Sequence, residues 1–322
     1  MPSTPRTGPR LADRLDGLLF FPVTPFRREP DGRAGAVDLD AFTAHLSARL
    51  AAGPAAVFAC CGTGEFASLG LQEYAGCVRA AVRAAAGRVP VVAGVGYGAA
   101  LAGQFAGAAQ AAGANGLLVL PPYLVAGDPA GLREHYRAVA GSTDLDLIVY
   151  QRGTAVFTPE VVADLAELPT VVGFKDGHGD LDLMQRIICA VRERHGAGRL
   201  RYLNGLPTAE MSQLAYRGIG VTGYSSAAFC FAPDLATAFH RAYRADDREL
   251  VDALLEHFYR PLVELRRLGS GYAVSLVKAG VRLAGPDPGP VRPPLSDPAP
   301  EHVDRLAEVI SAGRRILQEY AR

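Results

Sequence analysis

The sequence predicts an α/β fold, a (β/α)8 TIM barrel, followed by a C-terminal helical extension. Short apolar runs rich in β-branched residues alternate with longer amphipathic or alanine-rich runs. Eight such strand–helix units fit into roughly 240 residues, the size expected of this barrel. The strand-like runs are apolar throughout, which is typical of parallel strands that are covered on both faces.

The expected strands are short and end at polar or glycine-rich turns. They lie at 18–23, 56–60, 89–93, 116–120, 145–150, 170–174, 200–203 and 219–222. An open doubly wound sheet is the alternative, and it predicts a glycine-rich dinucleotide loop after the first strand. Pro22-Val-Thr-Pro-Phe26 stands there instead. The later run Gly94-Val-Gly-Tyr-Gly98 is more typical of a tight turn. The closed barrel is therefore favoured.

Helices are expected between these strands, because apolar residues recur there every three or four positions. Some begin with start signals such as Thr158-Pro159. Expected helices include 38–52, 72–86, 99–112, 129–140, 180–194 and 208–216, and from residue 246 onward only helical runs remain, at 246–268, 272–284 and 300–320. We therefore divide the chain into an N-terminal arm (1–16), a catalytic barrel (17–245) and a helical extension packed on the barrel (246–322).

The length and composition are typical of a globular protein. Of its 322 residues, 49% are hydrophobic, and 33 basic residues balance 33 acidic ones. This balance gives no reason to expect nucleic acid or a membrane as a partner. No signal peptide or membrane span is predicted, so the expected location is the cytoplasm. The five cysteines and seven histidines follow no metal-binding spacing. We predict no metal site, and reduced cysteines in the core.

Three features at strand ends suggest a reaction. Lys175 ends the sixth strand, Tyr150 ends the fifth, and the turn Gly62-Thr63-Gly64 follows the second. The carboxyl ends of barrel strands share one mouth, where the active site lies. Burial lowers the pKa of a lysine, and a neutral amine attacks ketones to form an imine. The sequence therefore indicates an imine-forming enzyme.

Each of these residues has an expected role. Lys175 is the nucleophile, Tyr150 shuttles protons, and the turn with the Thr63 hydroxyl grips a substrate carboxylate through backbone N–H groups. Taken singly, Lys175 paired with Asp176, or a structural Tyr150, remains an alternative. Together, the residues favour a catalytic site. For Glu65 we expect a structural role, either capping the next helix or fixing the turn.

The motifs Gly62-Thr-Gly-Glu65, Tyr150 and Gly173-Phe-Lys175 stand in a familiar order and spacing. On them the chain resembles the dihydrodipicolinate synthase and N-acetylneuraminate lyase superfamily of Schiff-base-forming barrels. Further segments resemble its 5-dehydro-4-deoxyglucarate dehydratase branch, namely 21–26, 120–124, 173–177, 224–227, 271–278 and 289–295. Cys61, Gln151 and Cys230 depart from that branch close to the expected pocket, as does the pair Gly153-Thr154.

The resemblance implies a lyase that dehydrates and decarboxylates a keto-deoxy sugar diacid, the small-molecule partner of the chain. It implies no cofactor, because a lysine imine is itself an electron sink. It also implies a homo-oligomer, with a tetramer expected. Candidates for holding the distal end of the substrate are Arg152, Ser225, Ser226 and Gly205. Tyr123 either reaches across a subunit interface or stays within its own barrel.

Two other functions stay open. A pyruvate-dependent aldolase or synthase of the same superfamily would act on another 2-keto-3-deoxy acid and release pyruvate rather than carbon dioxide. A non-catalytic keto-acid-binding barrel would form no adduct on Lys175.

Overall fold

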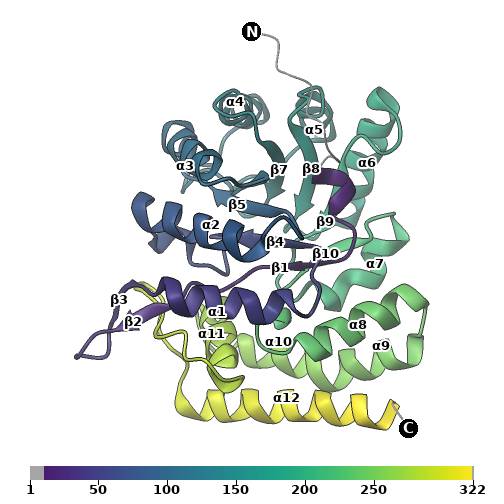
Figure 1. Ribbon diagram of the computed structural model, residues 1–322. Helices are drawn as coiled ribbons and strands as arrows, with labels where there is room; N and C mark the ends of the chain where they lie inside the picture. Colours follow the sequence, from purple (N-terminus) through teal and green to yellow (C-terminus); the bar gives the residue numbers. More distant parts are fainter. Residues whose placement is uncertain (1–10, 321–322) are drawn as a thin grey trace.

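The computed structural model describes residues 11–320, and it confirms the predicted barrel (Figure 1). Eight parallel strands close in the order β1-β10-β9-β8-β7-β6-β5-β4, and β1 pairs with both β10 and β4. The barrel strands are β1 (Leu18–Phe20), β4 (Ala56–Ala59), β5 (Val91–Val95), β6 (Gly116–Val119), β7 (Asp146–Gln151), β8 (Val171–Asp176), β9 (Arg201–Asn204) and β10 (Gly223–Ser226). Seven of them overlap the predicted runs.

The eighth predicted strand, 219–222, is wrong. Residues 219–222 lie in the connection after α7, where Val221 N donates a hydrogen bond to Tyr216 O, and β10 begins only at Gly223. The β-branched residues of the connection gave the stronger local signal. The true strand, Gly-Tyr-Ser-Ser, has weak strand propensity of its own and is formed by pairing with β1 and β9.

Helices cover the outside of the barrel, and several begin at the polar residues expected to cap them. Asp38, Asp128, Thr158 and Asp180 each accept a hydrogen bond from a backbone N–H of the helix that follows. These helices are α1 (Leu39–Leu50), α2 (Leu71–Ala85), α3 (Ala99–Ala111), α4 (Pro129–Ala140), α5 (Pro159–Leu165), α6 (Leu181–His195), α7 (Gln213–Gly218) and α8 (Pro233–Ala245), with short 3-10 turns η2 (Phe66–Ser68), η3 (Ala209–Ser212) and η4 (Ala228–Cys230).

The remaining helices gather beside α8 at one side of the barrel, with α12 outermost (Figure 1). They are α9 (Arg248–Leu254), which runs through the π-helical turn η5 (Leu255–Tyr259) into α10 (Arg260–Arg266), and then α11 (Tyr272–Leu283) and α12 (Pro300–Tyr320). The domain boundary at residue 246 stays a prediction.

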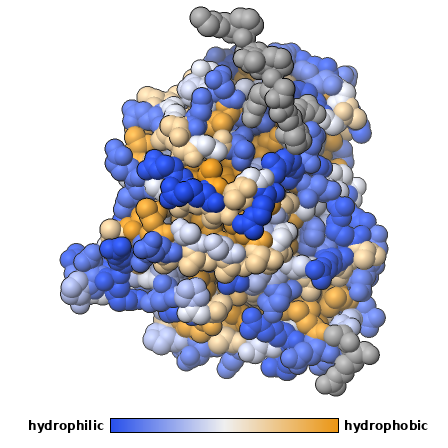
Figure 2. Space-filling view, viewed as in Figure 1, coloured by the Kyte–Doolittle hydropathy of each residue, from blue (hydrophilic) through white to orange (hydrophobic). Residues whose placement is uncertain are grey.

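An unexpected antiparallel hairpin, β2 (Phe26–Arg28) and β3 (Ala34–Val37), projects from the first strand–helix connection. Figure 2 shows that its tip is hydrophilic.

The core has two layers. Alternate strand residues such as Leu19, Phe58 and Ile148 fill the barrel interior, and a larger cluster lies between the strands and the helices. Leu11 and Leu15 join the interior cluster. The Leu11 N–H donates to Asp146 at the first residue of β7, so this segment packs across the amino ends of the strands.

The predicted arm (1–16) lies mostly outside the described residues. Its described part contains the 3-10 helix η1 (Leu11–Arg14). Among residues 11–320, no helix is long and apolar enough to cross a membrane.

Candidate active site

A β-bulge aims Lys175 into the barrel. Leu147 on β7 pairs with Val171 on β8, but the next residue, Ile148, pairs with Gly173, so Val172 is an extra residue. Val172 belongs to the interior cluster, whereas Phe174 packs in the outer layer. The shift leaves Lys175 facing inward and directly beside Tyr150. Gly173, inside this otherwise apolar run, is a local sign of the bulge that our prediction from the sequence did not use.

Lys175 lies in a tight, largely apolar setting. The residue is 4% exposed, and its Nζ lies 4.1 Å from the centre of the Tyr150 ring and 4.9 Å from that of Phe21. A Cβ at position 205 would come within 2.9 Å of the same Nζ, so glycine is needed there. Within residues 11–320, Lys175 forms no ion pair, because Asp176 faces outward and accepts hydrogen bonds from Gln151, Tyr216 and His178. The alternative of a Lys175–Asp176 pair is wrong.

The Tyr150 hydroxyl connects Lys175 to Arg152. It donates to Gly205 O at 2.9 Å and accepts from an Arg152 guanidinium nitrogen at 3.2 Å. Burial raises the pKa of Tyr150, but the nearby Lys175 and Arg152 outweigh it, so the pKa lies below its ordinary value. A phenol of this kind can give and take a proton next to the amine.

These groups line one cavity of about 290 Å³ at the carboxyl ends of the strands. The predicted site residues Gly62, Thr63, Arg152, Gly205 and Ser225 line it together with Lys175 and Tyr150, and their roles stay predictions. Among residues 11–320, the lining contains three basic side chains, Arg152, Lys175 and Arg266, and no aspartate or glutamate. Such a cavity favours an anion, and more so a dianion.

Three residues predicted to bind substrate do not line the cavity. The Gly64 N–H donates to Cys61 O within the turn. The Ser226 hydroxyl is buried and accepts from Phe229 N. Tyr123 is 64% exposed on the loop after β6 and touches only the Tyr97 ring among aromatic neighbours. The polar groups of Gly64 and Ser226 are used within their own turns, and the substrate-binding role of all three residues stays a prediction.

Most of the residues that differ from the dehydratase branch do not line the cavity. Gln151 is buried, donates to Asp176 and accepts from Phe157 N, and Cys230 donates its thiol hydrogen to Phe21 O. Only Cys61 of the three lines the cavity, and burial raises the pKa of its thiol to about 12. The cysteines are free, but Cys189 is exposed, so the prediction that all lie in the core is wrong for it. In residues 11–320, no group of three His, Cys, Asp or Glu residues could hold a metal ion.

The C-terminal helices form one wall of the cavity, which the sequence did not predict. Leu262 and Arg266 of α10 line it, together with α11 residues 272–274, 276 and 277. Thr208, from the loop after β9, is a further lining residue that was missed. The sequence did contain a sign of this wall. Segment 271–278 lies outside the barrel, yet it carries part of the family resemblance.

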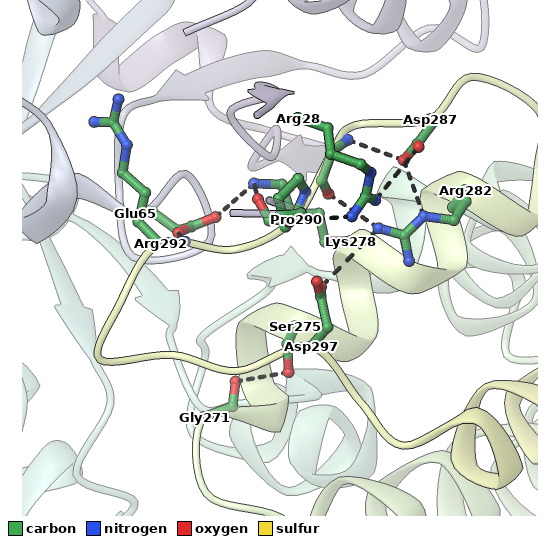
Figure 3. Close-up of polar contacts among 12 residues, drawn as sticks. Arg28, Glu65, Gly271, Ser275, Lys278, Arg282, Asp287, Pro290, Arg292 and Asp297 are labelled. Carbon is green, nitrogen blue, oxygen red and sulfur yellow. Dashed lines mark hydrogen bonds and ion pairs between the residues drawn. The ribbon is translucent and has the colours of Figure 1, made fainter. Parts of the chain in front are cut away.

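Glu65 and Lys278 join that wall to the Gly62–Glu65 turn (Figure 3). Both side chains are fully buried, and Lys278 Nζ lies 2.8 Å from Glu65 Oε1 and 2.9 Å from Pro290 O. The second Glu65 oxygen accepts from Arg292 N at 2.9 Å. Burial lowers the pKa of Lys278, and the Glu65 carboxylate opposes this. Glu65 makes no helix-capping bond, so it fixes the turn rather than capping η2.

Comparison with known proteins agrees with this geometry. The model of the dihydrodipicolinate synthetase family matches residues 14–313. The chain belongs to this family. A Streptomyces griseus protein named "Probable 5-dehydro-4-deoxyglucarate dehydratase" is 61% identical over 97% of this chain and 96% of its own length. A Streptomyces coelicolor protein, "Probable 5-dehydro-4-deoxyglucarate dehydratase 1", is 57% identical over 98% of this chain and 99% of its own.

A solved structure confirms the family fold. Dihydrodipicolinate synthase from Bacillus clausii superposes with a TM-score of 0.84 at 26% identity, covering 94% of this chain and 99% of that protein.

Replacing Lys278 by Met should destabilise the fold, because it leaves a buried carboxylate without a counter-charge. We expect the free energy of unfolding to fall by about 3–5 kcal/mol in equilibrium urea denaturation. Arg282→Met, one turn further along α11 at a partly exposed pair, is the matched control and should lose less than about 1 kcal/mol. Equal losses in the two variants would contradict a structural role for the buried pair.

Tyr150 should ionise below the ordinary tyrosine pKa of about 10. The chain has no tryptophan, so tyrosinate absorbance can be followed directly. The difference titration between wild type and Tyr150→Phe isolates this hydroxyl. Arg152→Met removes a nearby cation and a hydrogen-bond donor, and should raise the pKa of Tyr150. Coincident titrations of wild type and Tyr150→Phe up to the ordinary pKa would refute the assignment.

Proposed function

We propose that the chain is a Schiff-base-forming lyase that converts 5-dehydro-4-deoxy-D-glucarate into 2,5-dioxopentanoate, carbon dioxide and water. The observation that carries this proposal is the cavity itself, where a lysine and a phenol face a space lined by three basic residues and no acidic ones. A keto diacid supplies both the carbonyl and the negative charges that such a space favours. Relatives at 57–61% identity carry the name of this dehydratase.

The reaction begins at the keto carbon of the substrate. The uncharged Lys175 amine adds to it, and Tyr150 passes a proton to the departing hydroxyl, which leaves as water to give a protonated imine. The Gly62–Thr63 turn holds the carboxylate next to the keto carbon, with the Thr63 hydroxyl as a donor. Thr63 lines the cavity and makes no hydrogen bond within residues 11–320, so its hydroxyl is free for this task.

The imine then drives the two eliminations. A proton leaves the neighbouring methylene, and the β-hydroxyl departs as water, giving a conjugated iminium. The distal carboxylate leaves as carbon dioxide when its bonding electrons move into that iminium. Protonation and hydrolysis of the imine return the amine and release the product. The water consumed in the hydrolysis balances the one released in imine formation, so no cofactor is required.

We further propose that the protein is a homo-oligomer, and that the loop after β6 lies at the contact. Tyr123, Leu124 and Val125 are consecutive, and they are 64%, 79% and 63% exposed. Exposed apolar clusters of this kind are typical of protein contacts. The tetramer and the placement of Tyr123 across an interface rest on the family resemblance, and the cytoplasmic location rests on the sequence.

Incubating the protein with 5-dehydro-4-deoxy-D-glucarate should release carbon dioxide and 2,5-dioxopentanoate. Lys175→Ala should abolish turnover and leave the circular dichroism spectrum unchanged, and Tyr150→Phe should slow turnover about 10²–10⁴-fold. Borohydride reduction in the presence of the substrate should leave a mass adduct on Lys175. Lys175→Ala activity within about tenfold of wild type would defeat the proposal. Pyruvate release instead of carbon dioxide would indicate an aldolase.

Leu124→Glu should weaken assembly, because it places a charge in an apolar contact. Size-exclusion chromatography with light scattering should show wild type as an oligomer and the variant shifted toward smaller species. Leu101→Glu, at another exposed leucine on α3, is the matched control. A monomeric wild type at micromolar concentration would contradict the oligomer.

A further inference from the structure

Arg266 brings a positive charge to the cavity from outside the barrel. It lies in the last turn of α10, is half-buried and lines the cavity one turn after Leu262. Its guanidinium donates one hydrogen bond, to the Thr208 hydroxyl. Within residues 11–320 it forms no ion pair and no other hydrogen bond, so the rest of its five N–H donors remain available.

Within the part of the chain that the structure describes, no carboxylate forms an ion pair with Arg266. Burial lowers its pKa, and the neighbouring cations Arg267 and Arg152 lower it further, while Glu210 opposes them. Glu210 is itself fully buried, its pKa is raised to about 7 by burial, and its carboxyl oxygens accept no hydrogen bond from Arg266. A partly desolvated guanidinium in this setting is stabilised by an anion that enters the cavity.

Thr208 is held in an unusual conformation beside Arg266. Its φ and ψ are 53° and 61°, in the left-handed region, which is rare for a β-branched residue. Such conformations cluster at functional sites, although Ala86 and Asp246 adopt them here as helix C-caps. Because the Thr208 hydroxyl accepts from Arg266, its own hydrogen can be donated to a ligand in the cavity.

The two arginines of the lining have different hydrogen-bond partners. The Arg152 guanidinium is bonded to the Tyr150 hydroxyl, beside Lys175, whereas Arg266 is bonded to Thr208 in the loop after β9 and enters the cavity from α10. Arg152 therefore belongs to the place where the imine forms, and the remaining donors of Arg266 are open to another part of the ligand. A ligand with one carboxylate beside Lys175 and a second carboxylate several carbons away would meet Arg266 with the second.

We propose that Arg266 and Thr208 bind the distal carboxylate of the substrate and make the site selective for keto diacids over keto monoacids. The proposal rests on the proposed function for the identity of the substrate, but not on turnover. It assigns specificity to a residue of the C-terminal helices, whereas the sequence had placed distal recognition on Arg152 and the serines of β10.

The test compares two six-carbon keto acids that differ in the distal group, 2-oxoadipate and 2-oxohexanoate. Borohydride trapping on Lys175 gives the concentration of each acid at half-maximal labelling. Wild type should trap 2-oxoadipate at the lower concentration. Arg266→Met should raise the half-maximal concentration of 2-oxoadipate at least about 30-fold, and that of 2-oxohexanoate less than about threefold. Arg266→Lys should fall between, since it keeps the charge but not the planar fork.

Arg267→Met is the matched control, because Arg267 is the exposed neighbour on the same helix end and does not line the cavity. It should leave both concentrations within about twofold. Equal losses for the two acids in Arg266→Met, or unchanged trapping of 2-oxoadipate, would overturn the proposal. If neither acid forms an adduct with wild type, the imine chemistry of the proposed function fails. In that case, isothermal titration calorimetry measures how tightly wild type and Arg266→Met bind each of the two acids, and so tests the role of Arg266 without imine formation.

Discussion

A buried pair of opposite charges, Lys278 and Glu65, holds the site together. Neither side chain reaches solvent, so each needs the other as a partner, and each sits on a different part of the chain. Glu65 closes the turn that carries Gly62 and Thr63, and Lys278 lies on α11, which forms part of the cavity wall. The pair therefore fixes the distance between the barrel rim and the C-terminal helices. The cavity exists between these two parts, and neither encloses it alone.

Electrostatics divides the cavity into regions with different tasks. Near Lys175, the Tyr150 hydroxyl is bonded both to a carbonyl and to the Arg152 guanidinium, so its proton affinity is set by its neighbours. Acidic groups are kept out of the lining, and Asp176, next to Lys175 in sequence, is turned outward by the strand alternation and bound there. This arrangement leaves the positive charges of the cavity for a ligand.

Much of this could be read from the sequence, because periodicity and strand ends carry real geometric information. Lys175, Tyr150 and Thr63 could be brought together in advance, since a closed barrel gathers the carboxyl ends of its strands at one mouth. Other features had only a weak local signal. Gly173 alone marks the bulge at Val172 in an otherwise apolar run, and β10 has so little strand propensity that the β-branched residues at 219–222 predict a strand in its place. Arg266 was missed because a helical pattern does not reveal which charged residue turns toward a cavity supplied by another part of the chain.

The packing of Leu11 and Leu15 across the amino ends of the strands has a further consequence. These side chains fill the amino end of the barrel interior, whereas the cavity beside Lys175 lies at the carboxyl ends of the strands, between the loops and helices α10 and α11. Substitutions in α10 and α11 are therefore expected to alter how a ligand enters and leaves the cavity, and not only how tightly it binds.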